Sequence, residues 1–265
     1  MTDKKQKQIS MAASAIALKG VRMFLKAGRA AVDRGSPPTK RKTKPVVPVN
    51  KIPKQSLDVL LRVTRFNKNE LEALFTMYRR LVTAAQAAAP PTIIGQPVPK
   101  IDGIDQSTFR DVMHNTFDLV TEEIVLDRIW SAWDRGVNGG EGALKFEAWV
   151  KGRSVLLRGN IEEKKVYCFN VYDLNADGYI TRDEMFILLK NSLLKQPGDE
   201  DPDEGVRDLV ELVLRKLDID KDGKVSLDDY RQAVQQEPLL LEAFGQCVPT
   251  RRHAATFLKT LSTKQ

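Results

Sequence analysis

Residues 173–184 read DLNADGYITRDE, and this stretch decides the fold. Oxygen atoms recur in it at positions 1, 3, 5, 7 and 12, as the ligands of a hard cation would. The candidate ligands are the side chains of Asp173, Asn175, Asp177 and Glu184 and the main-chain carbonyl of Tyr179. Gly178 stands at position 6, where the chain must turn sharply with φ > 0, and Thr181 at position 9 would act through a water. The pattern predicts a cage of oxygens that suits Ca²⁺.

A surface turn rich in Asp, Asn and Gly is the alternative for this stretch, because such turns are common. A turn requires only two or three of these residues, whereas here every constrained position is filled. Apolar residues at helical spacing precede the loop from Val166 to Tyr172 and follow it from Met185 to Leu189. Helix, cation loop and helix together predict an EF-hand.

A second loop of the same type spans residues 218–229, DIDKDGKVSLDD. The candidate ligands are the side chains of Asp218, Asp220, Asp222 and Asp229 and the main-chain carbonyl of Lys224. Asp229 departs from the pattern, because position 12 is usually Glu and a shorter side chain reaches an ion less readily with both oxygens. We expect weaker Ca²⁺ binding and competition by Mg²⁺ at this loop. Ile180 and Val225, both at position 8, should pair across the two loops. Asp201 is expected to cap the helix before the second loop, with Pro202 at its first position.

The N-terminal half of the chain repeats the helical pattern with poorer loops. Asn67 and Glu70 form a capping-box pattern at the start of a helix. After an irregular, proline-containing loop, apolar residues resume at helical spacing from Phe109 to Met113. This outline is typical of a structural EF-hand without a usable cage.

The next loop begins at Asp134. Aligning Leu144 with position 8 and Phe146 with position 10 places Ala148 at position 12, which leaves three residues too many and no closing carboxylate. A register that uses Glu147 instead loses the acids at positions 1 to 5. We therefore expect no tight Ca²⁺ binding between Asp134 and Ala148. The predicted fold is all-α, with two lobes of paired EF-hands at residues 66–158 and 159–247 and short β bridges between paired loops.

Charge divides the chain into two parts. Residues 1–55 carry fourteen Lys and Arg and two Asp, whereas the remainder carries 28 basic and 33 acidic residues. The basic, Pro-rich arm is interpreted as disordered, as an electrostatic contact for a polyanion, or as a mitochondrial presequence. A polyanion here would be an acidic lipid, nucleic acid or the acidic tails of tubulin, which the composition alone does not separate.

Three further features bound the interpretation. We expect no stable membrane anchor, since no apolar run approaches a membrane span and the start Met-Thr-Asp lacks the glycine that myristoylation requires. Cys168 and Cys247 make no disulfide framework, and Cys168 is expected to be a buried thiol. We find no catalytic constellation around His114 or His253, so no enzyme is expected.

The C-terminal end is predicted to contribute apolar contacts. Residues 238–245 read PLLLEAFG, too apolar for a free tail, and Leu239, Leu240, Leu241 and Phe244 should pack on the C-terminal lobe or fill its groove. Residues 248–265 form a basic tail. Phe257, Leu258 and Leu261 lie in it at helical spacing, so this tail is either disordered or a second contact.

Three stretches of this chain resemble the calaxins, ciliary relatives of the neuronal calcium sensors. They are EEKKVYCFNVYDLNADGYITRDEMFILLKNSLLKQPGDEDPDEG, KLDIDKDGKVSLDDY and EPLLLEAFGQCVP, and the resemblance covers about Phe66 to Pro249. It implies a Ca²⁺ sensor located in the cytoplasm and cytoskeleton, in the axoneme of motile cilia and flagella. The implied partners are the outer-arm dynein heavy chain, the coiled coils of its docking complex and the tubulin of doublet microtubules; no nucleic acid is expected. The family usually has three ion-competent loops, and the disrupted loop at Asp134 departs from that number.

Ca²⁺ at the two C-terminal loops is expected to reorient the helices that follow them and expose Phe186 and Leu189 to a partner helix. One alternative is a regulator of a membrane or cytosolic target, like the neuronal sensors. Another is a Ca²⁺ buffer that barely opens.

Overall fold

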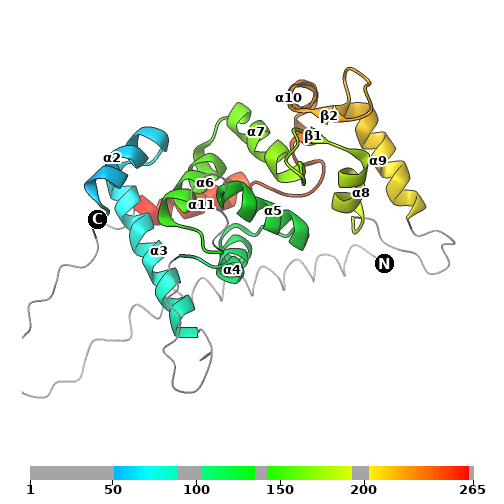
Figure 1. The fold of residues 1–265 in the computed structure, drawn as a ribbon. Coiled ribbons are helices and arrows are strands. Elements are labelled where there is room, and N and C mark those ends of the chain that lie inside the picture. The colour runs from blue at the N-terminus through cyan, green and yellow to red at the C-terminus, as the bar shows by residue number, and fades with distance from the viewer. Residues whose placement is uncertain (1–50, 89–102, 135–141, 193–202, 263–265) are drawn as a thin grey trace, which may run out of the picture.

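The computed structural model describes residues 51–88, 103–134, 142–192 and 203–262. Helices dominate it, and a single antiparallel pair of short strands joins two loops (Figure 1). The elements in chain order are α2 (Lys54–Val63), α3 (Lys68–Ala88), α4 (Gln106–Phe117), α5 (Glu123–Asp134), α6 (Phe146–Arg158), α7 (Ile161–Tyr172), β1 (Tyr179–Ile180), α8 (Arg182–Leu189), α9 (Glu204–Leu217), β2 (Val225–Ser226), α10 (Leu227–Gln236), the 3₁₀ helix η1 (Pro238–Glu242) and α11 (Arg251–Ser262).

Helix starts are set by reciprocal capping boxes, in which a polar N-cap and the third helical residue satisfy each other's backbone amides. The pairs are Asn67–Glu70 for α3, Asn160–Glu163 for α7, Thr181–Glu184 for α8 and Ser226–Asp229 for α10. The predicted cap at Asn67 is confirmed. The cap predicted at Asp201 lies outside the described residues, and α9 begins later than expected, at Glu204.

Loop-to-loop pairing organises each pair of hands. In the C-terminal pair, Ile180 in β1 faces Val225 in β2, as predicted. In the N-terminal pair, Ile104 and Leu144 exchange backbone hydrogen bonds of 3.0 and 2.8 Å. Leu144 therefore occupies the pairing position to which the sequence register assigned it. The all-α EF-hand fold with short β bridges is confirmed.

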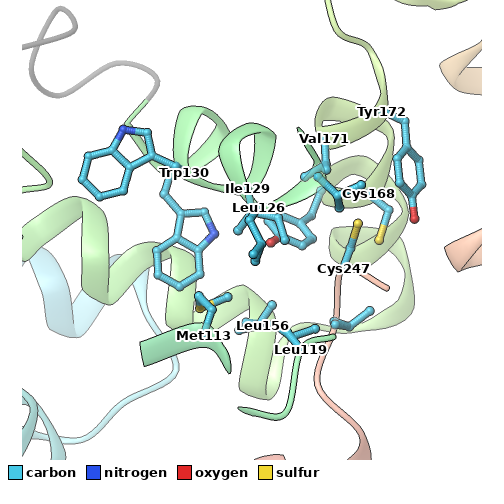
Figure 2. Close-up of a cluster of buried hydrophobic side chains, with 14 of the residues drawn as sticks. Met113, Leu119, Leu126, Ile129, Trp130, Leu156, Cys168, Val171, Tyr172 and Cys247 are labelled. Atoms are coloured by element: carbon cyan, nitrogen blue, oxygen red, sulfur yellow. The ribbon is translucent and has the colours of Figure 1, made fainter. Parts of the chain in front are cut away.

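One continuous apolar core extends through both pairs of hands. Figure 2 shows Leu126 and Ile129 of α5 in the same buried cluster as Val171 of α7. Cys168 and Cys247 also lie in this cluster as buried free thiols, which confirms the expectation for Cys168. Because α5 and α7 share the core, the helix that leads into residues 173–184 packs directly on the N-terminal half.

Helix α2 was not anticipated from the sequence. It follows Pro53 and buries Leu60 completely against α3 and α6. The basic arm assigned to residues 1–55 thus ends inside this helix, while its residues 1–50 lie outside the described part of the chain. No helix in the described residues is long and apolar enough to cross a membrane.

The segment after α10 packs as predicted, with one exception. Phe244 is buried edge-on against Tyr172 at 5.1 Å between ring centroids, and Leu240 and Leu241 are partly buried. Leu239 is 86% exposed, so its predicted packing is wrong. A 3₁₀ helix has three residues per turn, and three consecutive leucines on it therefore point in three directions.

The basic tail forms a helix on the N-terminal half. Helix α11 packs against α3, α4 and α6 and buries Phe257 and Leu261. The ring of Phe257 lies 5.2 Å from that of Phe117 in α4. Of the two alternatives for this tail, the structure shows the contact: its residues 251–262 run back from the C-terminal pair of hands to cover the N-terminal pair (Figure 1).

Candidate metal centre

Asp173 organises the first loop through its carboxylate. One oxygen accepts a hydrogen bond from the amide of Asp177 at 3.2 Å and the other from the amide of Gly178 at 3.1 Å. Gly178 has φ of +91°, in the region that only glycine adopts without strain. The conformation predicted at position 6 is therefore present, and it folds the loop back around the carboxylate at position 1.

Glu184 crosses from α8 to the opposite limb of this loop. Its Oε1 accepts a hydrogen bond from the amide of Asn175 at 3.1 Å, and its Oε2 accepts from the amide of Thr181 at 2.8 Å. The residue is only 6% exposed, so its negative charge is held inside the loop. The hydroxyl of Thr181 also donates to Oε2, at 2.9 Å. Both oxygens of Glu184 thus accept backbone amides, one from each limb of the loop.

The remaining candidate ligands of the first loop are also brought together. The amide nitrogen of the Asn175 side chain donates to Asp177 at 2.9 Å, and the backbone of Tyr179 enters β1 beside them. Every ligand predicted between 173 and 184 therefore comes from one compact loop.

The second loop repeats the backbone of the first. Asp218 accepts from the amides of Asp222 at 3.2 Å and Gly223 at 2.9 Å, and Gly223 has φ of +90°. Ligand oxygens of Asp218, Asp220 and Asp222 all lie within 4.8 Å of one another. Oxygen donors clustered in this way match the preference of Ca²⁺ and Mg²⁺, so the residues fit the predicted ion.

Repulsion among these carboxylates is visible at Asp220. A hydrogen bond from the amide of Asp222 lowers its pKa, but desolvation and the neighbouring charges of Asp222, Asp229 and Asp218 outweigh it and raise the pKa above its ordinary value. Like charges held together favour the protonated acid, and a cation removes that penalty. The loop is therefore built for a positive charge.

Asp229 does not cross its loop as Glu184 does. Its Oδ2 accepts from the amide of Ser226 at 3.0 Å and from the Ser226 hydroxyl at 2.5 Å, both at the start of its own helix. Glu184 makes the equivalent bonds and in addition reaches Asn175 on the far limb. That the shorter side chain closes the second cage less completely stays a prediction.

Replacing Asp229 by Glu is expected to strengthen Ca²⁺ binding at the second loop by about ten-fold, because one more methylene lets the carboxylate reach the ion with both oxygens. Competition by Mg²⁺ should fall in the same variant. Calorimetric titration with Ca²⁺ in the presence and absence of Mg²⁺ measures both effects. An Asp228→Glu variant, altered beside it at an exposed position, serves as the control and should leave the titration unchanged.

Two cross-loop contacts connect the sites. Arg182, at position 10 of the first loop, donates to the carbonyl of Gly223 at 2.7 Å and pairs with Glu211 of α9 at 2.7 Å. The ammonium of Lys224 lies 3.4 Å from the ring centroid of Tyr179, its counterpart at position 7 of the other loop. Spacing along the chain did not reveal Arg182, since its partners are distant in sequence.

An Arg182→Ala substitution is expected to reduce the coupling between the two ion sites while leaving the fold intact, because the Arg182–Glu211 pair is exposed and contributes little to stability. The two steps of a Ca²⁺ titration should become independent. Arg231→Ala, which removes an exposed ion pair with Asp228 elsewhere on the same pair of hands, provides the matched control. Equal coupling in both variants would contradict this role for Arg182.

Arg128 connects the first loop to the N-terminal half, and sequence reasoning also missed it. It projects from α5 and donates to the carbonyls of Val171 at 3.4 Å and Asp173 at 2.5 Å. A cation at the C-terminal end of a helix interacts favourably with its unpaired carbonyls. Arg128 thereby holds the junction between α7 and position 1 of the loop.

Comparisons with known proteins agree with this geometry. A family model described as an EF-hand domain pair matches residues 162–235, which contain both loops. Calaxin from Xenopus laevis is 46% identical over 202 residues, covering 76% of this chain and 90% of the relative. Calaxin from Homo sapiens is 43% identical over 192 residues, covering 72% and 84%. The chain belongs to the calaxin family.

Membership of the calaxin family and the EF-hand pair support a calcium sensor. The family model matches residues 162–235 and does not include the N-terminal pair of hands. Residues 135–141 of the N-terminal pair lie outside the described part of the chain. Ala148, placed at position 12 of that loop, is 1% exposed inside α6 and offers no oxygen from its side chain. That the Asp134–Ala148 loop binds no ion tightly stays a prediction.

Proposed function

We propose that this calaxin-family protein is a Ca²⁺-responsive adaptor of the outer dynein arm in the axoneme of motile cilia or flagella. The observation that carries the Ca²⁺ response is Glu184, whose carboxylate joins the start of α8 to the opposite limb of the 173–184 loop. The ciliary setting is inferred from the family to which the chain belongs.

When bound, Ca²⁺ would supply the positive charge that the oxygens of the two loops are arranged to share. Glu184 is the ligand that belongs to a following helix, so a shift of its carboxylate carries α8 with it. In the structure Met185, Leu188 and Leu189 of α8 are buried, and α8 packs along α9. Movement of α8 away from α9 would present this apolar face, with the partly buried Phe186, to a partner helix.

The N-terminal pair of hands would serve as a constant docking body. Arg128 and the shared core join it to the first loop and hold the two in a fixed arrangement at Asp173. The proposed partners are the dynein heavy chain, the coiled coils of the docking complex and tubulin. The basic residues 1–55 would contact the acidic tails of tubulin.

Sedimentation with doublet microtubules tests the proposal. The full chain and a form that lacks residues 1–50 are each pelleted with doublets at low and high Ca²⁺. We expect the full chain to pellet, the truncated form to pellet less, and Ca²⁺ to change the bound fraction. If neither form pellets with doublets that retain their outer arms, the axonemal role is wrong.

A Ca²⁺ buffer is the second candidate, because the apolar face of α8 is covered in the structure. A dye that fluoresces on apolar surfaces separates the two functions. A sensor should bind more dye as Ca²⁺ is added, whereas a buffer should bind Ca²⁺ with no change in dye fluorescence.

A further inference from the structure

A buried arginine in α6 has no counter-charge among the described residues. The side chain of Arg153 is 1% exposed, and its Nε and Nη1 have no hydrogen-bond partner in the described parts of the chain. Burial lowers the pKa of this guanidinium to about 9, so it still carries its proton at neutral pH. Arg158 in the same helix does have a counter-charge. Its two terminal nitrogens donate hydrogen bonds to the carboxylate of Glu70 at 2.6 and 2.9 Å.

In the part of the chain that the structure describes, aromatic rings rather than acids surround Arg153. Its Cζ lies 3.9 Å from the ring centroid of Trp149, 5.1 Å from that of Phe117 and 4.9 Å from that of Phe257. Stacking on aromatic faces compensates part of the loss of water. It does not replace the directional acceptors that a guanidinium binds best, which are the paired oxygens of a carboxylate. The cage is therefore incomplete for the cation that it contains.

Helix α11 closes this cage and cannot complete it. It contributes the ring of Phe257, but residues 251–262 contain no Asp or Glu, and their charged side chains are basic. Within residues 251–262, only Phe257 and Leu261 are buried. A helix of 12 residues is marginal in isolation, so its docking depends on these few contacts.

We propose that the site under α11 is a docking site for an acidic amphipathic helix of a partner protein, which displaces α11. An apolar side chain of the partner would take the place of Phe257, and a carboxylate one turn away would pair with Arg153. Charge complementarity selects this occupant. A carboxylate can accept hydrogen bonds from the unused donors of the buried Arg153, whereas the positive charges of a second basic helix would repel it. This inference does not depend on the proposed axonemal function.

Two peptides that differ only in carrying a carboxylate or a neutral amide at one position test whether the site prefers an acid. Both are blocked copies of residues 251–262, one with Ala254→Glu and the other with Ala254→Gln. Ala254 lies one turn before Phe257 and is partly buried in the docked helix, so either side chain is directed toward the same face. Fluorescently labelled copies are titrated into the full-length chain, and hydrogen exchange of its own residues 251–262 is followed in parallel. A Phe257→Ala chain, in which the tethered helix competes less, makes weak peptide binding measurable.

The Glu peptide is expected to bind about ten-fold more tightly than the Gln peptide and to increase hydrogen exchange in α11. Arg153→Leu, which retains an apolar side chain in the cage, should abolish that preference, and Arg153→Lys should retain part of it. Hydrogen exchange of α7 and α10 verifies that each variant is folded. The proposal is overturned if neither peptide binds, if both bind equally, or if the preference survives in Arg153→Leu.

Discussion

Glu184→Gln is expected to weaken Ca²⁺ binding at the first loop by about two orders of magnitude. The substitution retains the size of the side chain but removes a charge, and the affinity of such loops follows the number of charged ligands. It also weakens the acceptor to which the amides of Asn175 and Thr181 donate. Calorimetry on the full chain measures the loss directly, and the residual heat should come from the second loop.

The matched substitution in the other loop is Asp229→Asn. Because Asp229 bonds only within its own helix start, its loss should weaken the total response less than the loss of Glu184 does. An Asp183→Asn variant, altered at an exposed position beside Glu184, controls for the change of charge in the first turn of α8. Ca²⁺ heats for Glu184→Gln that match the parent chain would rule out the first loop as the dominant site.

Gly152→Ala is expected to destabilise the protein by about 1–3 kcal/mol, although the same change in a solvent-exposed helix stabilises it. A Cβ added at Gly152 would lie 2.2 Å from an atom of the Trp133 ring. That ring is 5% exposed and packs edge-on against Phe109 at 5.1 Å, so it has little room to move. Overpacking of α6 against α5 therefore outweighs the gain in helix propensity.

Denaturant unfolding in Ca²⁺-free buffer measures this change in the free energy of unfolding. Gly205→Ala, at an exposed position in the first turn of α9, is the control and should be neutral or stabilising. A Gly152→Ala/Trp133→Leu double variant should regain part of the lost stability relative to the sum of the two single changes. Equal stabilisation by Ala at positions 152 and 205 would show that α5 and α6 are not packed as described.

The ion loops were predictable because their information is local. The carboxylates at 173, 177 and 184 and the glycine at 178 act within twelve consecutive residues, so their spacing alone specifies the turn and the ligands. The same holds for the cap at Asn67, where the hydrogen-bonding partner is three residues away. Pairing of Ile180 with Val225 was also predictable, since position 8 has the same role in every loop of this type.

Contacts between distant segments were not predictable in the same way. Helix α2 and helix α11 each carry apolar residues on one face, but the sequence does not state which surface that face covers. Arg128 contacts Asp173 across 45 positions of the sequence, and Arg182 contacts Gly223 across 41. Residues so far apart show no local pattern from which the contact could be predicted. Leu239 shows the converse error, because an apolar residue in an apolar run was expected to pack and is exposed instead.

The 173–184 loop therefore owes its turn and its expected ligands to the sequence alone, because twelve neighbouring residues supply both. Only the tertiary structure decided what that loop is connected to. Packing of α5 on α7 places Arg128 at Asp173, and pairing of the strands places Arg182 at the second loop. The return of α11 encloses Arg153 with no acid from the described residues. These arrangements depend on which helix faces meet in the folded chain, and such long-range contacts follow from the simultaneous burial of all the apolar faces rather than from any local pattern.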